Sequence, residues 1–133
     1  MREILFRGKR VSNGEWVEGS LIKAKAENNK DVLYLIAPFT MSAFDVEEVI
    51  PETVGEYTGL TDKNGTKIFE GDVVKIGSEI IKWKCYHKVV FEEGQWFYLH
   101  EEISTKSYMG AWGSSCVEVI GNIHDNPELL GDK

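Results

Sequence analysis

The chain has little cysteine and proline, the residues that cross-link or rigidify a fold independently of its hydrophobic core. It contains two cysteines and three prolines among 133 residues. The cysteines, Cys85 and Cys116, are too few for a disulfide framework and do not have the spacing of metal ligands. We therefore interpret both as reduced thiols, which are typical of an intracellular protein.

Long apolar runs are also missing. No stretch approaches the roughly 18 apolar residues that a membrane-spanning helix requires. The first seven residues carry charge at three positions and lack the apolar region of a signal peptide. The sequence thus predicts a soluble cytoplasmic protein without contact to a membrane.

Positive charge is scarce as well, because the formal net charge is −7. Residues 1–30 carry seven Lys and Arg against four Asp and Glu, residues 31–72 two against nine, and residues 73–133 six against nine. An acidic chain repels phosphate, so this balance disfavours nucleic acid as the partner. The basic first 30 residues leave weak local contact with nucleic acid open.

What the chain does contain is a series of short apolar segments separated by turn residues. A hydrophobic fraction of 42% suits one packed domain of this length without staples. The alternation of polar and apolar residues predicts a β-hairpin over residues 3–23, and the apolar run Val32–Ile36 predicts a buried strand. This run is also a candidate for pairing with a second copy of the chain, so a homo-oligomer is one expectation.

Later segments predict strands near residues 73–76, 80–91, 96–99 and 116–123, a looser connection over 100–115, and a short terminal helix. No long amphipathic helix is expected. The fold class is therefore mostly β, a small barrel or roll. We expect one domain over 1–133, with an N-terminal β region (1–53), a barrel core (54–126) and a short C-terminal helix (127–133).

The densest signal lies between Gly59 and Val74. Asn64-Gly65 and Glu70-Gly71-Asp72 predict two tight turns with positive φ at the glycines. A calcium loop that began at Asp62 would need Gly at its sixth position and Glu at its twelfth, where Lys67 and Val73 stand. The segment thus predicts turns, and we interpret the carboxylates of Glu70 and Asp72 as solvated.

A candidate binding surface combines aromatic and basic residues: Lys82, Trp83, Lys84, Tyr108 and Trp112. On a strand, Lys82 and Lys84 would share one face and Trp83 the other. The alternation favours Trp83 in the core with solvated lysines, and contact with nucleic acid or a peptide is the other interpretation.

Catalytic and metal sites find little support in the pattern. Cys85 and His87 would lie side by side on a strand, but two ligands do not make a zinc site, and no orienting group can be assigned for a nucleophile. We expect no catalytic residue, no metal and no cofactor. An unrecognised enzyme that uses Cys85 and His87, or the scattered acidic residues, is an alternative.

Three segments together resemble the YopX family, which is encoded by phages and prophages of bacteria: Met1–Lys9, Tyr57–Val74 and Val119–Leu130. The resemblance is collinear and reaches both ends of the chain. It implies a mostly β protein with an SH3-like barrel, a bacterial host cytoplasm, and no established activity or functional residue.

Our leading hypothesis is thus a phage or prophage accessory protein that binds an unknown protein partner of the host or the phage. A nucleic-acid-associated protein that uses the basic N-terminal residues with Lys82 and Lys84 is the alternative.

Overall fold

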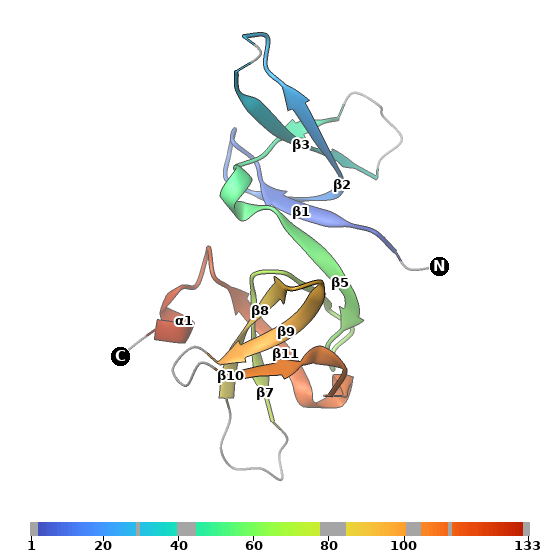
Figure 1. Ribbon diagram of the computed structural model, residues 1–133, viewed down its shortest axis with the longest axis vertical. Helices are drawn as coiled ribbons and strands as arrows, with labels where there is room; N and C mark the ends of the chain where they lie inside the picture. Colours follow the sequence, from blue (N-terminus) through green and yellow to red (C-terminus); the bar gives the residue numbers. More distant parts are fainter. Residues whose placement is uncertain are drawn as a thin grey trace. The chain divides into compact units, whose positions relative to one another are not determined.

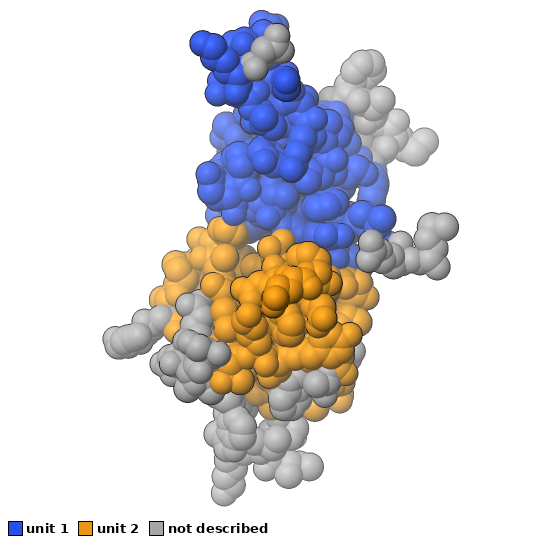
Figure 2. All heavy atoms as spheres, viewed as in Figure 1, with its two compact units in different colours: residues 1–57 blue, residues 58–133 orange. Residues whose placement is uncertain are grey.

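The computed structural model describes residues 3–28, 30–39, 45–77, 85–100, 105–111 and 113–131 (Figure 1). The chain divides into two compact units, residues 1–57 and 58–133, which are coloured separately in Figure 2. The sequence placed a sub-boundary at residues 53 and 54, a few positions before the division that the structure shows. That all 133 residues act as one domain stays a prediction.

The first unit is an antiparallel sheet in the order β4-β3-β2-β1-β5. Its elements are β1 (Phe6–Lys9), β2 (Trp16–Lys25), β3 (Val32–Pro38), β4 (Glu47–Glu48), the 3-10 turn η1 (Pro51–Thr53) and the start of β5 (Gly55–Thr61). The predicted N-terminal hairpin is confirmed, because β1 pairs with β2.

The predicted strand at Val32–Ile36 is also confirmed, as part of β3, but its predicted burial was wrong in part, because only Ile36 is buried and Val32 is exposed. The strand pairs with β2 along its whole length, and β4 pairs with its other edge at Leu35 and Ile36. One face of this sheet packs the buried side chains Val17, Ile36 and Val49. Apolar side chains of β2 and β3 thus pack against Val49, which follows β4, and their burial stabilises this sheet.

The second unit contains the end of β5, which is hydrogen-bonded to β6. It also contains a five-stranded antiparallel sheet in the order β10-β9-β8-β7-β11. Its elements are β6 (Lys67–Phe69), β7 (Asp72–Ile76), β8 (Cys85–Glu92), β9 (Gln95–His100), β10 (Thr105–Tyr108), the 3-10 turns η2 (Met109–Ala111) and η3 (Ser114–Cys116), β11 (Val117–Asn122) and the helix α1 (Glu128–Gly131).

The mostly β class and the short C-terminal helix are thus confirmed. Across the described ranges the pairings leave the five-stranded sheet open, with β10 and β11 at its edges, so closure into an SH3-like barrel stays a prediction. The looser connection expected over residues 100–115 was wrong in part. Thr105–Tyr108 form β10 and pair with β9, which the polar composition of this segment did not reveal.

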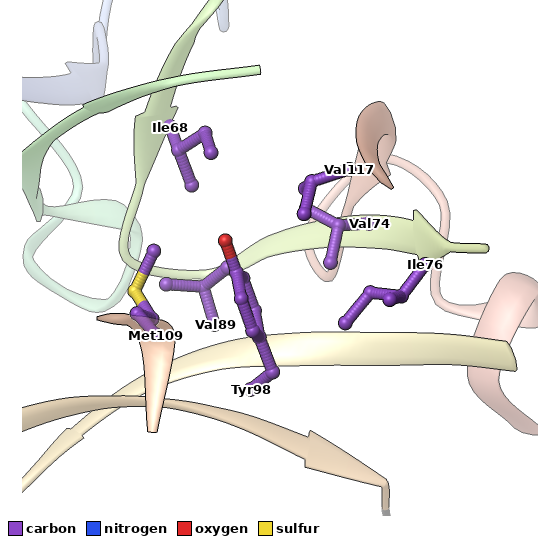
Figure 3. Packing of buried hydrophobic residues seen from close by; sticks show 7 residues of the cluster. All are labelled: Ile68, Val74, Ile76, Val89, Tyr98, Met109 and Val117. Atoms are coloured by element: carbon purple, nitrogen blue, oxygen red, sulfur yellow. The ribbon is translucent and has the colours of Figure 1, made fainter. Parts of the chain in front are cut away.

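The core of the second unit surrounds the ring of Tyr98 (Figure 3). Seven buried side chains from β6 to β11 form this cluster: Ile68, Val74, Ile76, Val89, Tyr98, Met109 and Val117. Val74, Val89 and Tyr98 come from three neighbouring strands and point to the same face of the sheet. The other face of β8, β9 and β10 therefore points away from this core.

The excursion through β8, β9 and β10 begins and ends at neighbouring backbone positions. Ile76 and Val117 are opposite each other in the pairing of β7 with β11. Just beyond them, the Gly77 amide donates a hydrogen bond to the Cys116 carbonyl with an N···O distance of 2.9 Å. The two ends of the excursion are therefore held together by the frame that β7 and β11 provide.

Gly65 and Gly71 have φ of 81° and 89°, as the two predicted turns require. Valine at either position should lower the free energy of unfolding by about 1 kcal/mol or more, because a β-branched residue is strained in the left-handed region. Gly71→Val should cost more, because Gly71 is buried and the branched side chain would have to fit against His124 and Ile123, whose atoms already lie 3.7–3.9 Å from a Cβ there, whereas Gly65 is exposed. Thermal denaturation measures both effects.

The matched control is Gly113→Val, because Gly113 lies outside the left-handed region and a Cβ there would meet only Ser115 Oγ at 4.0 Å. Equal melting temperatures for the three variants would contradict the proposed strain.

Candidate functional site

Asp62 holds the turn between β5 and β6 together and joins it to β11. Its carboxylate is 3% exposed. Oδ1 accepts hydrogen bonds from the amides of Asn64 at 2.8 Å and Thr66 at 2.9 Å, and Oδ2 accepts one from the Val119 amide at 2.9 Å. The Lys63 amide donates to the Val117 carbonyl alongside. The turn thus covers the outer edge of β11, where a strand would otherwise pair.

Two opposing effects set the pKa of Asp62. Burial raises it, but the hydrogen bonds from Val119, Thr66 and Asn64, together with the charge of Lys63, outweigh burial and hold the pKa below the usual 3.8. The carboxylate is therefore ionised at neutral pH and is committed to three backbone donors. We assign it a structural role, which agrees with the predicted turn.

The second turn differs from the expectation. The solvated carboxylate predicted for Asp72 was wrong, because Asp72 is 1% exposed and its Oδ2 accepts a hydrogen bond from the Phe69 amide at 2.7 Å. Asp72 opens β7 and closes the Glu70-Gly71 turn onto the end of β6. Its short spacing to Phe69 explains why the side chain turns inward rather than toward solvent.

The surface with the strongest binding chemistry is the outer face of β8, β9 and β10. It consists of Tyr86, Lys88, Phe97, Leu99, Lys106 and Tyr108, and we call it the aromatic–lysine face. The register places Tyr108 opposite Phe97, and it places Lys106 and Lys88 on either side of Leu99. A row with two aromatic rings thus lies beside a row with two lysines.

The aromatic rings on this face are accessible. Tyr108 is 58% exposed and Tyr86 is 43% exposed, while Phe97 and Leu99 are partly buried. Lys106 Nζ lies 5.7 Å from the centre of the Phe97 ring, in the range of a cation–π contact. The side chains of β8, β9 and β10 therefore present ring faces and ammonium groups at the same surface.

Two lysines on this side of the sheet form ion pairs with glutamates. Lys106 contacts Glu92, and this hydrogen bond is the main reason why the pKa of Lys106 lies above 10.5. On the next strand, Lys75 lies 3.5 Å from Glu118. These pairs lie at an accessible surface, where ion pairs contribute little stability.

Beyond β8, the C-terminal segment covers the same side of the sheet. A Cβ at Gly121 of β11 would lie 2.5 Å from Asn126 Oδ1 and 3.0 Å from the Leu129 side chain. Val73, which faces Lys88 across β7 and β8, is fully buried. The helix α1 also contacts β8, so part of β8 is covered as well, and the exposed side chains described on this face include Tyr86, Lys106 and Tyr108.

Of the five residues predicted as a binding surface, only Tyr108 lies within the described ranges, and it belongs to the aromatic–lysine face. Lys82, Trp83, Lys84 and Trp112 lie outside those ranges. Sequence reasoning missed the other members of the face. The alternation of Tyr86, Lys88 and Val90 with buried His87 and Val89 was the signal that could have found them.

The structure brings together two histidines that are distant in sequence. The rings of His87 and His100 are 5.2 Å apart and nearly perpendicular, and His87 also packs edge-on against Tyr98. His87 is 8% exposed and lies at the core side of β8. Its contacts are those of a packing residue. The Cys85 side chain is outside the described part of the chain, so the enzyme hypothesis stays a prediction.

Within the described ranges no three His, Cys, Asp or Glu residues are grouped so that they could bind a metal ion. None of the helices in those ranges has the length and apolar character needed to cross a membrane.

Comparison with known proteins identifies a family and several similar solved structures. The family model described as YopX protein matches residues 5–131. The crystal structure of protein EF1440 from Enterococcus faecalis is similar with a TM-score of 0.60 and 24% identity, covering 98% of this chain and 100% of that one. The crystal structure of protein yopX from Bacillus subtilis has a TM-score of 0.58 and 17% identity, covering 100% and 99%. No curated protein matches.

Proposed function

Because the chain belongs to the YopX family, we propose that it is a phage or prophage accessory protein that acts by binding a partner rather than by catalysis. The phage setting and the bacterial cytoplasm rest on what the family resemblance implies. The binding role rests on the aromatic–lysine face, which is the one observation that carries it.

The aromatic–lysine face exposes apolar ring surface to water, which is unfavourable, and a partner that covered this surface would gain free energy. Burial of apolar surface contributes about 25 cal/mol per Å², and aromatic rings are the residues most often found at the centre of binding surfaces. Tyr108 and Tyr86 expose their rings beside the partly buried Phe97. Such a cluster is typical of an interaction site rather than of a neutral surface.

Site-specific photo-crosslinking tests this proposal. Benzoylphenylalanine replaces Tyr86 or Tyr108 in the protein expressed in bacterial cells, and the control replaces Phe39, which is 65% exposed and belongs to the first unit. After irradiation we expect adducts from positions 86 and 108 at a higher yield than from position 39. Adducts that are absent, or equally abundant at position 39, would contradict the proposal. An adduct of twice the chain mass would identify a second copy as the partner.

A further inference from the structure

The chemistry of the aromatic–lysine face also indicates what kind of partner it accepts. We propose that its ligand is a single-stranded nucleic acid, whose bases stack on the exposed rings of Tyr86 and Tyr108 and whose phosphates lie beside Lys88 and Lys106. This inference rests on the proposed binding function and deepens it.

The rings suit unpaired bases. Every base has a π face, so exposed aromatic side chains bind single strands with little dependence on sequence. Tyr108 and Phe97 are directly opposite each other on β10 and β9, and Tyr86 lies on the next strand, β8. In a duplex the base faces are stacked inside the helix. A ring platform on an open sheet therefore selects single strands over duplex.

The lysines argue for phosphate rather than for a protein surface. Protein interfaces are enriched in aromatic residues but depleted in lysine. Here Lys106 and Lys88 flank Leu99 in the row beside the rings, and Lys106 Nζ already lies over the Phe97 ring. Two residues along a strand span roughly 7 Å, so each ammonium group lies within reach of the backbone of a base stacked on the neighbouring ring.

The acidic residues on the same side of the sheet lower the affinity that we expect for a nucleic acid. Glu92 contacts Lys106, and Glu118 contacts both Lys75 and Lys63 at 3.5 Å. Ion pairs at such accessible positions contribute little and are screened by salt, so a phosphate can replace a carboxylate. The net charge of −7 opposes the approach of a polyanion. We therefore expect binding in the micromolar range at low salt that weakens steeply as salt is added.

Fluorescence anisotropy with a labelled 15-nucleotide oligothymidylate and the full chain tests the inference. With about two or three phosphate contacts, log K should fall by roughly 1.4–2.1 per decade of salt. Tyr108→Ala should weaken binding at least about fivefold, since one stacked base contributes that much or more. Lys106→Ala should reduce the salt slope by about 0.7.

The matched controls are Phe39→Ala and Lys25→Ala, which remove an exposed aromatic residue and an exposed lysine from the first unit. Neither should change the affinity by more than about twofold or the salt slope by more than about 0.2, and duplex of the same length should bind more weakly. The inference would be overturned if no salt-dependent binding were found at about 20 mM salt. It would also be overturned if the control variants lost as much affinity as the Tyr108 and Lys106 variants.

The two proposals fail in different ways. Treating the photo-adducts of Tyr86 and Tyr108 variants with nuclease or protease identifies the bound partner. Adducts that nuclease shortens support the nucleic acid. Adducts that only protease removes overturn it and leave the binding function standing, whereas the absence of adducts above control refutes both.

Discussion

Asp62→Ala should lower the free energy of unfolding of the second unit by about 3–6 kcal/mol. The change removes the acceptor of three backbone amides at 2.8–2.9 Å. Each hydrogen bond to a charged acceptor contributes roughly 1.5–3 kcal/mol. The total is expected to be smaller than three full contributions, because Asn64 and Thr66 are exposed and their amides can bind water instead. This loss is a large fraction of the 5–15 kcal/mol that ordinarily stabilises a domain. Urea denaturation followed by tryptophan fluorescence measures it.

Asp125→Ala is the matched control, because Asp125 is an exposed carboxylate of the same unit that accepts a hydrogen bond from the Asn122 side chain at 3.2 Å. It should cost less than about 1 kcal/mol. Asp62→Asn keeps one oxygen for Asn64 and Thr66 but turns an amide donor toward the Val119 amide, so its loss should lie between the two. Equal stability of the Asp62 and Asp125 alanine variants would refute the role of Asp62.

The same carboxylate predicts a loss of stability in acid. The pKa of Asp62 is lower in the folded chain than the ordinary 3.8. Its contribution is therefore complete above that ordinary value and is lost as the pH falls through the lower, folded pKa. Asp62→Asn should flatten this part of the pH profile, because the amide does not titrate. An unchanged acid limb in that variant would assign the pH dependence to other carboxylates.

Tyr98→Ala should destabilise the second unit by about 3–5 kcal/mol. The side chain is 2% exposed and lies at the centre of the cluster in Figure 3, and replacing a buried aromatic ring by a methyl group leaves a cavity of nearly its own size. Tyr98→Phe keeps the ring and should retain most of the stability. Both effects are read from urea denaturation.

Tyr108→Ala removes the same residue type from an exposed site and should cost less than about 1 kcal/mol. Burial raises the pKa of Tyr98 to about 12. The folded state therefore loses stability as the pH rises from the ordinary value of 10 toward 12, because the unfolded chain releases this proton first. If Tyr98→Ala were no more costly than Tyr108→Ala, the central position of Tyr98 in the core would be refuted.

Local signals predicted the parts of this fold that depend on neighbours in sequence. Asn64-Gly65 and Gly71 gave the two turns, because positive φ has few alternatives to glycine. The alternation in residues 16–22 gave β2, since its period of two matches a half-buried strand. The family resemblance agreed with these predictions at both ends of the chain.

Features that depend on pairing could not be read in the same way. Val119 is 57 residues from Asp62, and only the folded second unit brings its amide to the carboxylate. The aromatic–lysine face depends on the registers of β8, β9 and β10, and a shift by one residue would send Tyr86 and Phe97 to the core. Asp72 was misread because a carboxylate in a turn is ordinarily solvated, and its acceptance of the Phe69 amide overrides that tendency.

The joined ends of the β8–β10 excursion have a consequence for how this protein can be changed. The Gly77 amide and the Cys116 carbonyl are hydrogen-bonded, so the chain leaves and re-enters the frame at one place. A segment exchanged between those two points, for example from EF1440, needs only to supply its own inward residues in place of Val89, Tyr98 and Met109. The frame fastened by Asp62 can therefore accept a different segment between these two points, and a graft of this kind would leave the turns at Gly65 and Gly71 unchanged.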